Sequence, residues 1–94
     1  MATLHKDIRR MAIQRYTAPV QIYQAVEELN ELAVELMHWN KRCDNHARVV
    51  EEIGDCTIMI EQLADIFGIE RVRTVVEQKY QRLEARLTNG GSLP

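Results

Sequence analysis

The sequence predicts an all-α fold, a small bundle of about four helices built on an antiparallel helical hairpin and completed by oligomerisation. Apolar residues recur every three to four positions over most of the 94 residues. The four glycines and two prolines sit largely where those helical periods break. No segment shows the alternation typical of a half-buried strand. A chain of this length is expected to form one domain, over residues 1–94.

The first expected helix spans about residues 3–16, which carry apolar residues at helical spacing. The sequence Thr17-Ala18-Pro19 then interrupts the pattern. Thr17 or Ala18 would serve as the cap residue, and Pro19 suits the first turn of a second helix because its missing N–H has no partner there in any case.

The second and third expected helices carry the longest apolar stripes and form the hairpin. They span about residues 19–40 and 46–67. The polar segment 41–45 connects them, with Asp44 or Asn45 as the next cap. So short a connection favours antiparallel packing of the two helices.

The fourth expected helix spans about residues 69–87, after Gly68, which would end the third helix as its C-cap. A flexible tail is expected from about residue 88. A chain this short buries only a limited fraction of its surface. We therefore expect the helix faces to pair in a homodimer or homotetramer.

Composition narrows the class of partner. Lys plus Arg number 12 against 14 for Asp plus Glu, so a net charge of −2 gives no drive toward nucleic acid or an anionic membrane. No signal peptide or membrane-length apolar run is visible. Cys43 and Cys56 fit neither a disulfide scaffold nor a metal motif. Both are expected to be free thiols in a reducing cytoplasm, with Cys56 on a core face and Cys43 near a loop.

Two acidic motifs are the most informative feature of the chain. They are Glu28-x-x-Glu31 and Glu52-x-x-Asp55, and each places two carboxylates one turn apart on one helix face, beside the apolar stripe. Four converging carboxylates need a counter-charge, and Mg²⁺ prefers such oxygen ligands. Gly54 costs about 1 kcal/mol in a helix interior, so we expect another backbone or a ligand to approach closely there.

Antiparallel pairing about the 41–45 connection predicts the register. Positions then lie opposite one another when their numbers sum to roughly 86. This places Glu31 level with Asp55, with Glu28 and Glu52 one turn to either side. The group spans roughly 9 Å along the helices, a distance that side chains can close onto one or two ions. Glu35 comes alongside Glu52 as a fifth carboxylate.

With their flanking residues, the two motifs resemble those of the MazG-like all-α nucleoside triphosphate pyrophosphohydrolases. The likeness is carried by residues 25–32 and 51–63 and extends over roughly residues 22–87. It implies an enzyme that cleaves a nucleoside or deoxynucleoside triphosphate to the monophosphate and pyrophosphate, in house-cleaning or control of the nucleotide pool. It also implies Mg²⁺, or Mn²⁺, as cofactor. The metal ligands and catalytic residues would be Glu28, Glu31, Glu52 and Asp55.

The same resemblance implies basic residues on the fourth helix that hold the phosphates, and Lys79 and Arg82 are the candidates. Glu27, Glu35 and Glu51 are candidates for carboxylates that support the ligands or accept a proton. Which ligand acts as general base stays open. The preferred base or sugar of the substrate stays open as well.

Two other classes of protein are alternatives to this enzyme. The chain could instead be a non-catalytic helical oligomerisation or interaction module, with the acidic motifs as rim charges. The element from Glu35 to His38 is of the Glu-x-x-His type found in di-iron bundles, but such bundles need two of these elements and the chain has one. Gln21 and Asn30 are minor candidates for contacts with the base or sugar.

Overall fold

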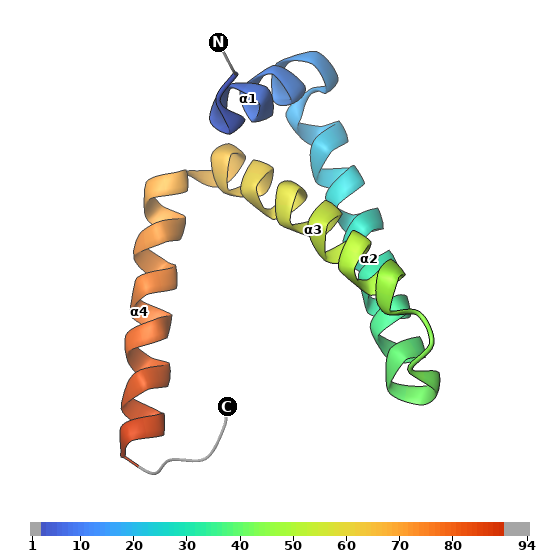
Figure 1. Cartoon of the computed structure of the whole chain (residues 1–94). Helices are drawn as coiled ribbons and strands as arrows, with labels where there is room; N and C mark the ends of the chain where they lie inside the picture. Colours follow the sequence, from blue (N-terminus) through green and yellow to red (C-terminus); the bar gives the residue numbers. More distant parts are fainter. Residues whose placement is uncertain (1–2, 90–94) are drawn as a thin grey trace.

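A computed structural model of the chain describes residues 3–89 and is helical through almost all of that range (Figure 1). The helices are α1 (His5–Tyr16), α2 (Ala18–Arg42), α3 (His46–Phe67) and α4 (Ile69–Thr88). The predicted all-α class with four helices is confirmed over these residues. Both ends of α3 lie where they were predicted, and the ends of the other helices lie within two residues of prediction. Beyond Asn89 the predicted tail lies outside the described residues.

α2 and α3 pack along each other and run in opposite directions from the connection at residues 43–45 (Figure 1). Near the start of α2, the amide of Gln21 donates to the side-chain oxygen of Gln62 at 2.7 Å. Farther along, the thiol of Cys56 donates to the backbone carbonyl of Glu28 at 3.2 Å.

The register of these contacts is offset by two to three residues from the predicted one. Beside the connection, Asn45 reaches back to Glu35 and donates to its backbone carbonyl at 3.0 Å, so a side chain at the start of α3 contacts α2 there as well. At this offset Glu31 lies level with residues 52–53 of α3 and not with Asp55.

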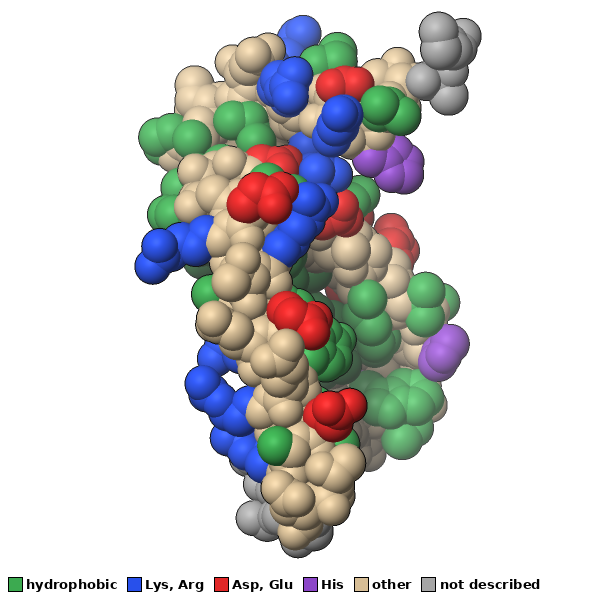
Figure 2. Space-filling model, turned by 90° about the vertical axis from the view of Figure 1, so that its left-hand side faces the viewer, with side chains coloured by type: hydrophobic (Ala, Val, Ile, Leu, Met, Phe, Trp, Pro, Cys, Tyr) green, Lys and Arg blue, Asp and Glu red, His purple; other side chains and the backbone are tan. Residues whose placement is uncertain are grey.

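The apolar interior of a single copy is small. Only Ala25, Cys56 and Met59 are buried among the described apolar residues. Residues predicted to face inward are largely exposed, including Leu29 at 39 % and Phe67 at 68 %. Figure 2, which looks onto the side of the molecule where α4 lies, shows hydrophobic side chains open on the surface. One copy thus leaves uncovered much of the apolar surface that the helical stripes predict to be buried.

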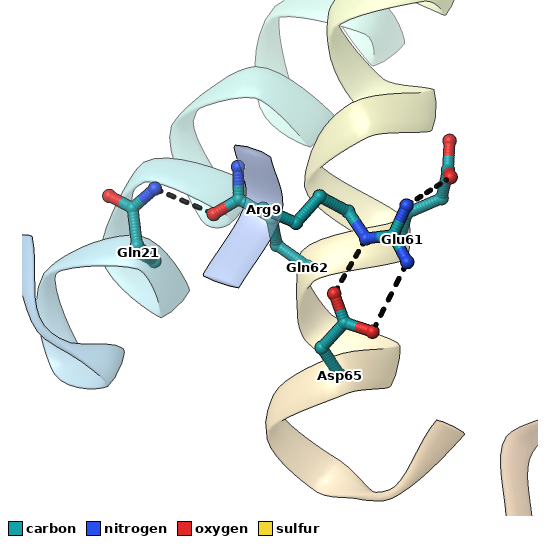
Figure 3. A network of polar contacts seen from close by, with 5 residues as sticks. All are labelled: Arg9, Gln21, Glu61, Gln62 and Asp65. Atoms are coloured by element: carbon teal, nitrogen blue, oxygen red, sulfur yellow. Dashed lines mark hydrogen bonds and ion pairs between the residues drawn. The ribbon is translucent and has the colours of Figure 1, made fainter. Parts of the chain in front are cut away.

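A polar network attaches α1 to α3 (Figure 3). Nε of Arg9 on α1 donates to Asp65 at 2.6 Å, and a second guanidinium nitrogen lies 3.1 Å from Glu61. The Arg9 side chain is only 12 % exposed. Its hydrogen bond to Asp65 raises the pKa of the guanidinium above its ordinary value. α1 is therefore held on the pair of longer helices by charge as well as by packing.

α4 leaves the other helices at Gly68, whose φ of 112° is a conformation that side-chain-bearing residues rarely adopt. The Gly68 N–H donates to the Ala64 carbonyl at 2.9 Å, so its predicted C-cap role is confirmed. Of the described helices, α4 contacts only α3 and then extends away from it (Figure 1).

The two thiols lie in the predicted environments, with Cys56 buried and Cys43 exposed. Cys43 ends α2 in the left-handed conformation, with φ 55°. Among the described residues, no helix combines the length and the apolarity needed to span a bilayer.

Candidate metal centre

Three carboxylates converge where α2 and α3 pack together. Glu28 and Glu31 come from α2 and Glu52 from α3, and each offers an oxygen within 4.8 Å of the other two. Small buried residues lie beside them, namely Ala25, one turn before Glu28, and Cys56, one turn after Glu52. Small side chains at a helix contact let the two backbones approach. The local sequence thus brings carboxylates from both helices to one point.

The group lacks a positive counter-charge. In the part of the chain that the structure describes, no Lys or Arg forms an ion pair with Glu28, Glu31 or Glu52. One oxygen of Glu28 and one of Glu52 are buried without a hydrogen-bond partner. Desolvation, followed by the charges of Glu31 and Glu28, raises the pKa of Glu52 to about 6. The arrangement therefore carries an electrostatic cost that a bound cation would relieve.

The donor set fits a hard divalent cation. Three carboxylates offer only oxygen, and Mg²⁺ or Mn²⁺ prefers oxygen ligands. The neighbouring Cys56 does not supply a thiolate, because burial and then the charge of Glu28 raise the pKa of its thiol. A shallow groove of about 310 Å³ opens beside the group, lined by Asn30, Glu31, Val34, Glu35 and Glu52. A ligand in this groove would reach the carboxylates from solvent.

Asp55, the fourth predicted ligand, is not brought into the group. It is exposed, and its carboxylate lies outside the three that converge. The register offset described above explains this, because it places Glu52 beside Glu31 where Asp55 was expected. The charge of Asp55 still adds to the rise in the pKa of Glu52.

The remaining predicted carboxylates divide into two kinds. Glu35 is half-buried and lines the groove, whereas Glu27 and Glu51 are exposed and do not join the group. Asn30, a minor candidate for substrate contact, also lines the groove. The other minor candidate, Gln21, is buried, donates to Gln62 and does not line the groove.

The structure of a single copy does not bring Lys79 and Arg82 to the carboxylates. Both lie on α4, which contacts only α3 among the described helices. The charges that raise the pKa of Glu52 are all carboxylates, with no cation from α4 among the causes. Their role in phosphate binding stays a prediction.

The expectation at Gly54 fails in the single copy, and the rejected Glu-x-x-His alternative gains no support. No atom from elsewhere in the described chain lies within 4 Å of a Cβ built on Gly54, so the close approach expected there is absent. His38 contacts Asp44 at 2.5 Å and stands apart from the group, so the Glu-x-x-His element does not contribute a metal ligand.

Two polar contacts could not be predicted from any motif in the sequence. Arg9 and Asp65 are 56 positions apart, and neither belongs to a recognisable motif. Asn45 was expected to cap α3, but it makes no side-chain cap hydrogen bond and instead donates to Glu35 at 2.5 Å. Both contacts depend on how the helices pack, which a helical period does not specify.

In comparisons with known proteins, no family model matches the chain, and neither the curated proteins nor the solved structures contain a match.

Proposed function

We propose that this chain is a Mg²⁺-dependent nucleoside triphosphate pyrophosphohydrolase that converts (d)NTP to (d)NMP and pyrophosphate. The observation that carries the proposal is the convergence of Glu28, Glu31 and Glu52, with buried and unpartnered oxygens, beside an open groove. The resemblance of the paired motifs supplies the reaction class. A cytoplasmic role in house-cleaning or nucleotide-pool control fits this reaction.

The three carboxylates would hold the cation, and the exposed side of Glu31 would face the incoming triphosphate. When bound, the cation would neutralise phosphate charge and make water a better nucleophile. Water then forms a bond to one of the two phosphorus atoms that the α–β bridging oxygen joins, and the bond from that phosphorus to the bridging oxygen breaks. The electron pair of the broken bond stays on the bridging oxygen, which leaves with the other product, and a carboxylate of the groove accepts the proton from water.

We further propose that the α2–α3 hairpin is the core of a homodimer or homotetramer. Exposed apolar residues on all four helices support this, including Leu29 beside the acidic group and Tyr80 on α4. A second copy could also supply Lys79 and Arg82 to the carboxylates. Light scattering should give a mass at least twice that of the 10.9 kDa chain, and a monomeric mass at working concentration would contradict the assembly.

The activity is tested by incubating the protein with a panel of ribo- and deoxyribonucleoside triphosphates and Mg²⁺, and assaying pyrophosphate. Release should require Mg²⁺ and stop with a chelator. Glu31→Gln should abolish the release of pyrophosphate while the protein stays folded by circular dichroism. Glu70→Gln removes an exposed carboxylate at the start of α4 and should leave the release of pyrophosphate unchanged. Full activity in Glu31→Gln would show that the site is misplaced.

The alternative is a non-catalytic oligomerisation or interaction module, which the large exposed apolar surface favours. The two proposals differ in two measurable properties, the binding of Mg²⁺ and the release of pyrophosphate. Oligomers that bind no Mg²⁺ by calorimetry and release no pyrophosphate from any triphosphate would establish the module and exclude the enzyme.

A further inference from the structure

Asn45 is placed unusually for a residue that begins a helix. It occupies the N-cap position of α3, where an asparagine side-chain oxygen ordinarily accepts a hydrogen bond from a backbone N–H of the first turn. Here the side chain makes no such bond. It is 8 % exposed and turns back toward α2 instead.

The partners of Asn45 fix its orientation. Its amide nitrogen donates to the backbone carbonyl of Glu35 at 3.0 Å and to Oε2 of the same residue at 2.5 Å. Both partners accept hydrogen bonds, so only the NH₂ end of the amide can face them. Its oxygen is left buried, with no partner among residues 3–89. Asn45 thus forgoes a helix cap and leaves a polar atom unsatisfied while it holds Glu35.

The carboxylate that Asn45 holds lies beside the metal centre. Glu35 follows Glu31 by four positions, so the two lie on one face of α2. Both line the same groove with Glu52. Glu35 does not join the converging group of three. Since Oε2 is engaged by Asn45, only Oε1 is free of that hydrogen bond.

We infer that Glu35 is a fourth carboxylate of the metal centre that accepts hydrogen bonds from water held in the groove, and that Asn45 positions it. This inference rests on the proposed Mg²⁺ site. Mg²⁺ keeps several of its waters when it binds protein, and carboxylates around that hydration shell tune its affinity. Asn45 is a positioning residue, since it acts only through Glu35.

The test is the Mg²⁺ affinity of Glu35→Gln, Asn45→Asp and the double variant, measured by calorimetry on the full chain. Each single variant should bind Mg²⁺ about 10–100-fold more weakly than the unaltered protein. Asp caps a helix as well as Asn does, but its carboxylate cannot donate to Glu35. A purely capping role for Asn45 therefore predicts unchanged affinity in Asn45→Asp. The double variant should be no weaker than Glu35→Gln alone, because both changes act through one carboxylate.

Controls separate this inference from the proposed activity. Glu70→Gln, the matched loss of an exposed carboxylate, should leave Mg²⁺ affinity unchanged. Unchanged affinity in Glu35→Gln would overturn the inference, and complete loss of binding would make Glu35 a direct ligand and overturn it as well. Weakened Mg²⁺ binding without pyrophosphate release in the unaltered protein would support this role of Glu35 and refute the hydrolase. A chain that binds no Mg²⁺ would overturn both.

Discussion

The two ends of the α2–α3 pair each gather carboxylates, but only one end supplies a cation. Near the end of α3, Arg9 contacts Asp65 at 2.6 Å and Glu61 at 3.1 Å. Toward the start of α3, Glu52 meets Glu28 of the opposite helix with no such partner in the described structure. The difference shows that a count of acids does not identify a metal centre. A better indication is converging carboxylates whose counter-charge the fold does not provide.

The difference between the two ends is tested most directly by neutralising one carboxylate at each end. Glu28→Gln should reduce pyrophosphate release by about 100-fold or more and raise the melting temperature of the metal-free protein, because it relieves repulsion. Asp65→Asn should have the opposite effect on stability. It should lower the melting temperature, because Arg9 loses one of its two carboxylate partners, and it should leave Mg²⁺ binding unchanged. Calorimetry and thermal melts on both variants check this. If both variants changed the melting temperature and Mg²⁺ binding in the same way, the two ends would be equivalent.

The pH dependence of stability should come from the end without a cation. The pKa of Glu52 is raised to about 6 in the folded chain from its ordinary value of 4.5. The protonated carboxyl therefore favours folding at pH below about 4.5, and this contribution is lost as the pH rises through about 6. The metal-free protein should accordingly melt at a higher temperature near pH 5 than near pH 7.5. Glu52→Gln should reduce this difference, as should Mg²⁺ at the higher pH. A Glu52→Gln profile as steep as that of the unaltered protein would assign the effect to other groups.

Substitution of uncharged polar groups between the same helices should change the stability more moderately. Gln21→Ala leaves the amide of Gln62 buried without its partner, which should cost about 1–3 kcal/mol in the free energy of unfolding. Replacing both residues by leucine removes both polar groups and should be closer to neutral. Denaturant titrations of the two variants measure the difference. A double variant less stable than Gln21→Ala would mean that the pair stabilises the fold by more than satisfying each other's hydrogen-bonding groups.

The smallest expected effect is at Gly54, between the acidic residues of α3. Because no described atom would meet a new Cβ there, Gly54→Ala should raise the stability by about 1 kcal/mol, the difference in helix propensity. Thermal melts and light scattering check that the assembly is unchanged. A loss of stability would show that another chain packs against this face.

The sequence predicted the helices well because each is a local property. Gly68 marked the start of α4, and the spacing of Glu28 and Glu31 placed both on one face. The register could not be predicted in the same way, because it depends on contacts between the helices, such as that of Asn45 with Glu35 ten positions earlier. The exclusion of Asp55 from the acidic group accompanies the offset in register.

Burial could not be predicted from the stripes for a different reason. A helical stripe shows which face avoids water, but it does not identify the chain that covers that face. Leu29 and Phe67 lie on predicted inward faces and are exposed in one copy. Arg9 was missed because one of several arginines on a short helix has no pattern that points to Asp65.

The left-handed turn at Cys43 has a practical consequence for studying the assembly. It places an exposed thiol at one end of the α2–α3 pair, whereas Cys56 is buried and the pKa of its thiol is raised. Since the thiolate is the reactive form, a maleimide spin label at neutral pH should attach at Cys43 alone. The label-to-label distance in an oligomer would then report whether two copies meet at their connecting turns or lie with those turns at opposite ends, with no engineered cysteine needed.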